Sequence, residues 1–275
     1  MNKKTAIILG LLSIVMAVLI SGCGGDKDKK APEGEKRKTI KVGATAGPQA
    51  QVLEAVKPVL AKEGIDMQIV EFNDYTMPNM ALDQGDIDAN SFQHKPFLDA
   101  QIKARDYKIT DIGNTVILPM GLYSKKVKSL DELKDGARVA IPNDPSNGGR
   151  ALLLMQAKGL VKIKPEAGIL PTPGDITENK KNLKIVEVEA AQAPSVLDDV
   201  DLVAINTNYA FVAKLDPAKD SLALEDKNSP YVCVIVVKTS NKDNEAMKKL
   251  VKAYQSPEVG KFIDDTFKGS IVKAW

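Results

Sequence analysis

The sequence predicts an α/β protein whose folded body, from Thr39 to Trp275, forms two domains. Short apolar runs rich in β-branched residues alternate with segments of helical periodicity, which is typical of strands connected by helices. Gly and Pro residues separate most of these runs. The body is longer than a typical single domain, and its length is sufficient for two domains. We therefore expect two α/β lobes with mainly parallel sheets.

The first residues are typical of a secretory signal peptide, which we assign to residues 1–22. Two lysines near the start precede an apolar run from Ala6 to Ile20, and this run is shorter than the ~20 residues that a transmembrane helix needs. Small residues stand directly before Cys23, which resembles the lipobox of bacterial lipoproteins. We expect Cys23 to be the lipidated first residue of the mature chain. The alternative is a plain signal peptide with an incidental cysteine.

Residues 23–38 are interpreted as a flexible tether between the lipid and the folded body. From residue 24 onward this segment has no large apolar side chain, so it cannot bury enough surface to offset its ordering entropy. Its acidic and basic residues alternate, which favours a solvated spacer over a membrane-binding patch. The whole chain has 38 basic and 36 acidic residues. This balance argues against a nucleic-acid partner, which would call for a basic face.

The helices and strands of the body are predicted from local patterns. A helix from Gln49 to Lys62 ends before Gly64, and Ser129 to Glu132 has the spacing of a capping box that opens another helix. The segment 162–182, rich in Pro, Gly and Lys, predicts an exposed loop with little structure of its own. The predicted strands are Ile40–Val42, Met67–Phe72, Thr115–Leu122, Arg138–Ile141, Leu183–Val188, Leu202–Ile205 and Val232–Val237.

Two long apolar strands, around 115–122 and 231–238, are candidates for crossing points between the lobes. On this hypothesis the first lobe comprises residues 39–120 and 232–275, and the second lobe comprises residues 121–231. Periodicity alone does not establish the crossing, so the division is a prediction of topology.

The stretch from Asn143 to Leu154 predicts an anion-binding turn. Pro145 and the Gly148–Gly149 pair mark a turn after a buried strand, and the apolar run that follows predicts a helix ending at Gly159. The start of a helix offers free backbone N–H groups and positive potential to an anion. Arg150, expected in the first helical turn, adds a guanidinium that can bind two oxygens. The alternative is that Arg150 pairs with a surface acid.

Four further stretches place polar or aromatic side chains at strand ends, where α/β sheets bind ligands. Strand alternation predicts that Asn206 and Asn208 share one side, and that Tyr231 and Cys233 share another. The alternative roles are helix capping for the asparagines and a structural hydrogen bond for His94, the single histidine. The stretches are Phe72–Asn79, Asn90–Pro96, Ala204–Tyr209 and Ser229–Val234.

The chain has too few cysteine and histidine residues to favour a metal site or a disulfide. With Cys23 lipidated, Cys233 is the only other cysteine, so we expect no intrachain disulfide. A metal site of the His/Cys type would have only His94 and Cys233 as ligands. We therefore expect neither a metal nor a cofactor.

Taken together, several motifs resemble the methionine-binding (NlpA-like) lipoprotein family, the substrate-binding proteins of ABC importers for methionine. The similarity runs from about Ile40 to Trp275 and implies a two-lobed periplasmic-binding-protein type II fold with two crossover strands at the hinge. It also implies an extracytoplasmic, lipid-anchored protein that delivers its ligand to an importer permease. The motifs are the lipobox, F-N-D-Y-T-M-P-N, S-F-Q-H-K-P-F-L, N-D-P-S-N-G-G-R-A-L, A-I-N-T-N-Y-A, S-P-Y-V and the terminal A-W.

The resemblance implies a role for each residue of the candidate site. Arg150 and Asn147 would hold the amino acid's carboxylate, and Asn206 would hold other polar atoms at the same end. An aromatic wall would enclose the thioether, since sulfur makes favourable contacts with aromatic rings. This wall would consist of Tyr75 and Phe92, with His94 beside them.

One position departs from the family pattern, because Cys233 stands where the family usually has asparagine after S/N-P-Y-V. A thiol is a weak acceptor compared with an amide oxygen. Cys233 would therefore weaken the contact with the ligand's ammonium, and a methionine-containing peptide or an N-substituted methionine is an alternative ligand. In another alternative, Cys233 points into the core as a small apolar residue.

Two other function classes compete with ligand binding. An enzyme would pair Cys233 as nucleophile with His94 as base, but Cys233 lies in an apolar strand, where burial disfavours the thiolate. The sequence has no G-x-S-x-G, Walker or H-E-x-x-H motif. A structural surface lipoprotein would suit the tether, but it leaves the aligned polar motifs unexplained. We predict a binding protein and not an enzyme.

Overall fold

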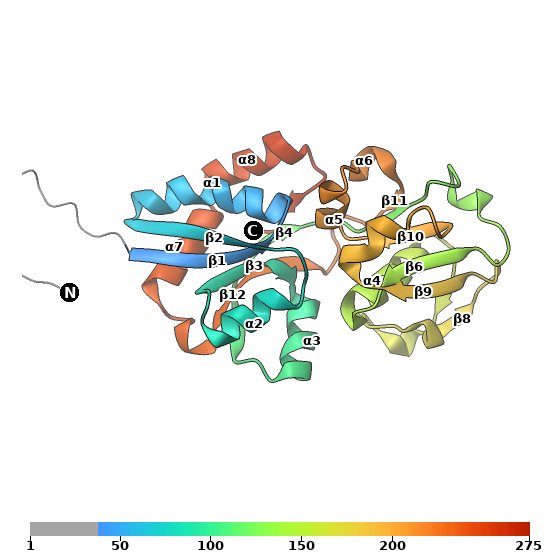
Figure 1. Ribbon diagram of the computed structural model, residues 1–275, viewed down its shortest axis with the longest axis horizontal. Helices are drawn as coiled ribbons and strands as arrows, with labels where there is room; N and C mark the ends of the chain where they lie inside the picture. The colour runs from blue at the N-terminus through green and yellow to red at the C-terminus, as the bar shows by residue number, and fades with distance from the viewer. Residues whose placement is uncertain (1–37) are drawn as a thin grey trace, which may run out of the picture. The chain divides into compact units, whose positions relative to one another are not determined.

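The computed structural model describes residues 38–275. The predicted signal peptide, the predicted lipidation site Cys23 and residues 24–37 of the predicted tether lie outside these residues. Lys38, the last residue assigned to the tether, begins the first strand. The described chain forms two large sheets and a small two-stranded sheet, with helices between the strands (Figure 1). This confirms the predicted α/β class. Of the helices in this range, none has the length and apolar character to cross a membrane.

The first sheet has six strands in the order β13-β4-β12-β3-β1-β2. β1 pairs in parallel with β2 and β3, whereas β12 and β13 pair antiparallel with their neighbours. The strands are β1 (Lys38–Thr45), β2 (Ile65–Phe72), β3 (Ala89–His94), β4 (Ile109–Ile117), β12 (Val232–Lys238) and β13 (Val272–Lys273).

The second sheet has five strands in the order β11-β5-β10-β6-β9. Here β6 pairs in parallel with β9 and β10, and β5 is antiparallel to β10 and β11. The strands are β5 (Gly121–Tyr123), β6 (Arg138–Pro142), β9 (Lys184–Val188), β10 (Leu202–Ile205) and β11 (Ser221–Leu224).

Helices cover both faces of each sheet, so the strands have apolar side chains on both sides. In β12, Cys233 and Ile235 belong to one buried cluster, and Val234 belongs to the cluster on the opposite face. This alternation explains why the strands read as nearly continuous apolar runs. The helices are α1 (Pro48–Lys62), α2 (Met77–Gln84), α3 (Lys95–Arg105), α4 (Pro145–Ala157), α5 (Thr207–Val212), α6 (Pro217–Asp220), α7 (Glu245–Tyr254) and α8 (Pro257–Phe267).

The predicted strand at 115–122 is two strands in different sheets. β4 ends at Ile117 in the first sheet, and β5 begins at Gly121 in the second. Pro119 lies between them and has no N–H to donate to a sheet ladder, so the run breaks there. The chain thus passes from one sheet to the other at residues 118–120.

Three other expectations need correction. Both large sheets are mixed rather than mainly parallel. The predicted capping box forms only a 3₁₀ turn, η1 (Leu130–Glu132), in which Ser129 makes no capping bond and Glu132 accepts from the Lys128 N–H at 2.8 Å. The predicted loop at 162–182 contains an antiparallel pair, β7 (Lys162–Ile163) and β8 (Ile176–Glu178).

Candidate functional site

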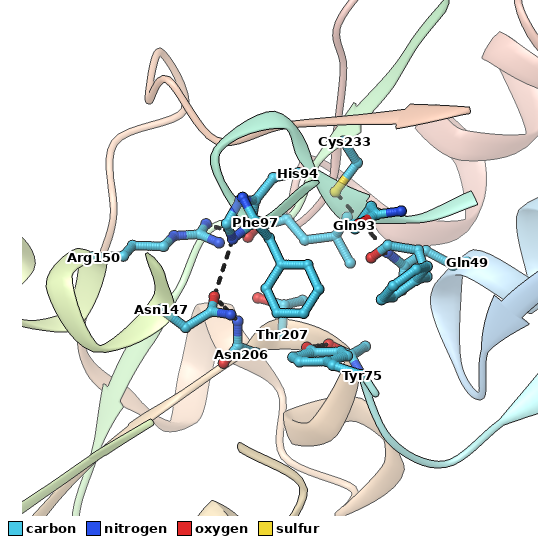
Figure 2. A pocket seen from close by; sticks show the side chains of 13 residues that line it. Gln49, Tyr75, Gln93, His94, Phe97, Asn147, Arg150, Asn206, Thr207 and Cys233 are labelled. Carbon is cyan, nitrogen blue, oxygen red and sulfur yellow. Dashed lines mark hydrogen bonds between the residues drawn. The ribbon is translucent and has the colours of Figure 1, made fainter. Parts of the chain in front are cut away.

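A cavity is lined by segments that extend from both large sheets (Figure 2). All seven residues predicted for the site line this one cavity, although they come from five separate stretches of sequence. The lining residues are Gln49, Tyr75, Phe92, Gln93, His94, Phe97, Leu118, Asn147, Arg150, Asn206, Thr207, Asn208 and Cys233.

Helix α4 begins earlier than predicted. Asp144 is its N-cap and accepts a hydrogen bond from the Asn147 N–H at 2.9 Å, and Pro145 occupies the first helical position. Arg150 therefore lies in the second turn rather than the first, and the glycine pair lies inside the helix. Two adjacent glycines are typical of a turn, so the sequence predicts a later start for this helix. The predicted end of this helix at Gly159 is confirmed, since Gly159 has φ +74° directly after the C-cap.

The two glycines of α4 allow close packing against other segments. A Cβ atom on Gly148 would lie 2.7 Å from the carbonyl oxygen of Pro142. A Cβ atom on Gly149 would lie 3.0 Å from Leu170 and Pro171. Gly148 thus allows α4 to approach the end of β6, and Gly149 allows it to approach the segment at 170–171, next to the helix positions of Asn147 and Arg150.

Arg150 forms a buried ion pair with Glu225. The Arg150 Nη2 group lies 2.5 Å from Glu225 Oε2, and the two side chains are 3% and 10% exposed. Arg150 Nε also donates to Glu225, and Nη2 donates to the Leu118 carbonyl at 2.8 Å. Burial alone would lower the pKa of Arg150, but the charge of Glu225 and its hydrogen bonds raise it. The alternative that Arg150 pairs with an acid is therefore correct, and this acid is internal rather than on the surface.

The Nη1 group of Arg150 is the part that remains for a ligand, because the bonds to Glu225 and Leu118 use Nε and Nη2. The guanidinium also lies over the ring of Tyr231, with 4.5 Å from Cζ to the ring centroid. Because Glu225 balances the charge of Arg150, this end of the cavity suits a zwitterion better than a simple anion.

His94 is held in one neutral tautomer by its two neighbours. Its Nδ1 accepts from the Phe97 N–H at 3.1 Å, so the ring proton is on Nε2. Nε2 lies 3.1 Å from Asn147 Oδ1 and donates to it. Burial, and then the positive charge of Arg150, lower the pKa of His94 to about 3. His94 is thus a structural hydrogen-bonder that also lines the cavity.

Two asparagines present polar atoms that have no partner among residues 38–275. Asn206 donates from Nδ2 to Asn147 Oδ1 at 2.8 Å, and its Oδ1 is buried without a partner. Asn208 accepts from the Tyr75 hydroxyl at 2.5 Å, and its Nδ2 is buried without a partner. Asn206 is the N-cap residue of α5, but its side chain makes no capping bond. The cavity therefore offers one amide acceptor and one amide donor.

Aromatic rings form one wall of the cavity. Tyr75 lies 6.0 Å from Phe92, 5.8 Å from Phe97 and 4.9 Å from Tyr209, measured between ring centroids. Tyr75 and Phe92 were predicted for this wall, and Phe97 was missed. Phe97 follows the His94 N-cap in α3, and the pattern of a buried helix start gives no reason to single it out.

Cys233 lines the cavity and is also part of the buried core. Its side chain is 5% exposed, and Gln49 Nε2 lies 4.0 Å from its sulfur. Burial raises the pKa of its thiol to about 12. A thiol that stays protonated is a poor nucleophile, which argues against the enzyme hypothesis. Tyr231 lies beside His94 at 5.1 Å between ring centroids, beneath Arg150 rather than in the cavity lining.

Gln49 and Glu225 were missed by the sequence reasoning. Gln49 is the second residue of α1, four positions after the end of β1, so the rule that strand ends carry site residues could have found it. Glu225 follows β11, but nothing local links it to Arg150, which is 75 residues away.

Comparisons with known proteins match nearly the whole chain. The family model described as NlpA lipoprotein matches residues 40–275. The D-methionine-binding lipoprotein MetQ of Salmonella typhimurium is 52% identical over 276 residues, which covers 99% of this chain and 98% of that protein. The MetQ protein of Escherichia coli K12 is 51% identical over 275 residues, with the same coverage of 99% and 98%.

Solved structures give the same result. A nutrient-binding protein from Burkholderia cenocepacia bound to methionine is 55% identical, with a TM-score of 0.83 over 86% of this chain and 100% of that chain. The methionine-binding protein MetQ is also 55% identical, with a TM-score of 0.84 over 86% of this chain and 98% of that chain. The likeness extends to the two-lobed substrate-binding fold and therefore confirms the predicted fold.

Proposed function

The chain belongs to the NlpA lipoprotein family, and on this premise we propose that it is a substrate-binding protein for methionine. Relatives at about half identity over their full length carry the name D-methionine-binding lipoprotein. A structure at 55% identity contains methionine. In this protein the ligand would bind in the cavity lined by Tyr75, Phe92, His94, Asn147, Arg150, Asn206 and Cys233.

The observation that carries the proposal is the set of polar atoms left free in the cavity. An α-amino acid has a carboxylate that needs donors and an ammonium that needs acceptors. Arg150 Nη1 and Asn208 Nδ2 are the free donors, and Asn206 Oδ1 is the free acceptor. With Asn147 already bonded to Asp144, His94 and Asn206, its role is to orient the neighbouring groups.

The aromatic wall suits the ligand's side chain. Each contact between sulfur and an aromatic ring contributes roughly 0.3–1.5 kcal/mol. The ring centroids of Tyr75 and Phe92 are 6.0 Å apart, so one thioether can contact both rings. A charged side chain would lose its hydration against this wall without gaining a partner.

We further propose that the protein works as a tethered receptor for an ABC importer. Lipidation at Cys23 would anchor it on the extracytoplasmic face of the cell membrane, and residues 23–38 would let the body reach the permease. Residues 39–120 with 232–275 would form one lobe and residues 121–231 the other, and the lobes would close on the ligand. Catalysis has no part in this role.

A longer ligand is a second candidate, because another cavity adjoins the aromatic wall. It shares Tyr75 and Phe97 with the first. Asp74, Asp144 and Glu189 line it, and these acids would suit a cationic amino terminus. A methionine-containing peptide would satisfy its terminus there and leave no ammonium near Cys233.

A thermal-shift screen tests these candidates. The delipidated protein is unfolded, dialysed and refolded, and is then screened against the amino acids and short methionine peptides. A ligand at 100 times its dissociation constant stabilises the protein by about 2.7 kcal/mol. We expect methionine to give the largest shift. A larger shift with a methionine peptide favours the longer ligand, and no shift with any compound favours a structural surface lipoprotein.

A further inference from the structure

Strand β3 contains an irregularity beside the cavity. In its pairing with β12, Ser91 lies opposite Ile235 and His94 lies opposite Cys233. β3 therefore advances three residues where β12 advances two, which places one extra residue in β3 between Ser91 and His94. Such a β-bulge bends a strand and redirects its side chains.

The bulge explains how three consecutive residues can line one cavity. A regular strand points successive side chains to opposite faces, so it would present only every second residue. Phe92, Gln93 and His94 all line the cavity. Among them are Phe92 of the proposed aromatic wall and His94, which bonds to Asn147.

Gln49 satisfies the backbone at the bulge. Its Nε2 donates to the Phe92 carbonyl at 2.6 Å, and its Oε1 accepts from the Thr45 hydroxyl at 2.6 Å. The same Nε2 lies 4.0 Å from the sulfur of Cys233 (Figure 2). Gln49 is 3% exposed, so the Phe92 carbonyl would be buried without this partner if the amide were removed. One side chain on α1 thus connects the end of β1 with β3 and β12.

A second set of amides holds the next residue of the bulge. Gln93 and Asn79 exchange two hydrogen bonds, of 2.7 Å and 2.6 Å. Gln93 also donates to Asn90 Oδ1 at 3.0 Å, and Asn90 donates to Asn79 Oδ1 at 3.0 Å. Asn79 and Asn90 are fully buried. Asn79 of α2 thus holds the side chain of Gln93, and Gln49 of α1 holds the carbonyl group of the preceding residue, Phe92.

We infer that Gln49 is a positioning residue of the binding site, which holds the β3 bulge so that Phe92 and His94 face the ligand. The role in ligand selection rests on the proposed methionine function, whereas the role in placing His94 does not. Gln49 itself contributes no free polar atom to the ligand, because both sides of its amide are engaged within the protein.

The substitution Gln49→Met tests the inference. It keeps the length of the side chain and removes the amide. Gln51→Met is the matched control, because Gln51 lies on the same helix and is exposed. The first readout uses the single histidine of the chain, since its ring Nε2–H gives one NMR signal, protected from exchange with water by its bond to Asn147. This readout needs no ligand.

In Gln49→Met we expect the His94 Nε2–H signal to shift and to exchange with water at least tenfold faster. Gln51→Met should leave the signal as in the parent protein. The second readout is the ratio of the methionine and norleucine affinities. It should fall about threefold in Gln49→Met, because sulfur loses its contact with a well-placed Phe92. If the parent binds no methionine, the proposed function fails, and the NMR result still decides the positioning role.

An unchanged His94 signal in a folded Gln49→Met protein overturns the inference. If that variant does not fold, Gln49→Glu replaces it. A protonated glutamic acid can donate to the Phe92 carbonyl and an ionised one cannot. The His94 signal of Gln49→Glu should therefore match the parent at pH 5 and differ from it at pH 8. A match at both pH values also overturns the inference when the 13C signal of the introduced carboxyl group shows that it ionises between them.

Discussion

At the scale of single residues, the ion pair between Arg150 and Glu225 determines the charge of the cavity. A buried charge is tolerated only with a partner. We therefore predict that Arg150→Met lowers the free energy of unfolding by about 3–5 kcal/mol, because Glu225 stays buried and loses its partner. Chemical denaturation at pH 7 measures this loss.

The double variant Arg150→Met with Glu225→Gln is the control for the lost charge. It should recover more than half of the lost stability, since the amide needs no counter-charge. It should still bind methionine poorly, because Nη1 is gone. If the double variant is as unstable as Arg150→Met, the loss comes from packing and not from the ion pair.

The single histidine predicts a dependence of stability on pH. Burial, and then Arg150, lower the pKa of His94 from 6.5 to about 3, so the folded protein favours the neutral ring. As the pH falls from 6.5 toward 3, His94 becomes protonated in the unfolded chain but stays neutral in the folded chain. This group's stabilisation is complete well above pH 6.5 and has decreased by about 2 kcal/mol by pH 5.

Denaturation curves between pH 5 and pH 7.5 measure this effect. In His94→Gln the free energy of unfolding should change less with pH over this range, by about 1 kcal/mol per pH unit. The acidic residues are the same in both proteins, so the difference comes from His94. Equal slopes in the two proteins would mean that the ring is not held neutral.

Cys233 gives a prediction about affinity. Cys233→Asn adds an amide oxygen that can accept from the ligand's ammonium, and we expect methionine to bind about tenfold tighter. A larger gain is not expected, because Gln49 Nε2 lies against this position and competes for the new oxygen. Cys233→Ala, measured by the same calorimetry, adds no acceptor and should show no gain. Equal affinities of the Asn and Ala variants would contradict this account.

At the scale of elements, helix α4 depends on its glycines. Gly148→Ala would place a Cβ atom 2.7 Å from the Pro142 carbonyl oxygen, and the helix would have to move away from β6. We predict a loss of about 1–3 kcal/mol in the free energy of unfolding. Gly174→Ala is the control, because its nearest neighbour would be 3.6 Å away. Equal effects of the two substitutions would show that the close approach does not matter.

Local patterns predicted most of the strands because both faces of each sheet are covered, and buried strands read as apolar runs. Local patterns gave wrong predictions where contacts with another segment determine the backbone conformation. Gly148 and Gly149 resemble a turn until the nearby Pro142 and Leu170 are known. The bulge in β3 is invisible in the sequence, because it exists only in the pairing with β12.

At the scale of the whole molecule, the cavity joins segments that leave the two large sheets. Tyr75, which follows β2, bonds to Asn208 in α5, and His94 at the end of β3 bonds to Asn147 in α4. The seven site residues were predicted from strand ends and from the family resemblance, and all seven line the cavity. Glu225 was not predicted, because its partner Arg150 lies 75 residues away in the sequence.

A crystal structure of the refolded protein with methionine tests the central claim most directly. We predict that the ligand's carboxylate lies within hydrogen-bond distance of Arg150 Nη1 and its ammonium within reach of Asn206 Oδ1. The sulfur should lie against Tyr75 and Phe92. Methionine bound in the opposite orientation, with its sulfur beside Arg150, or bound outside this cavity, would contradict the account.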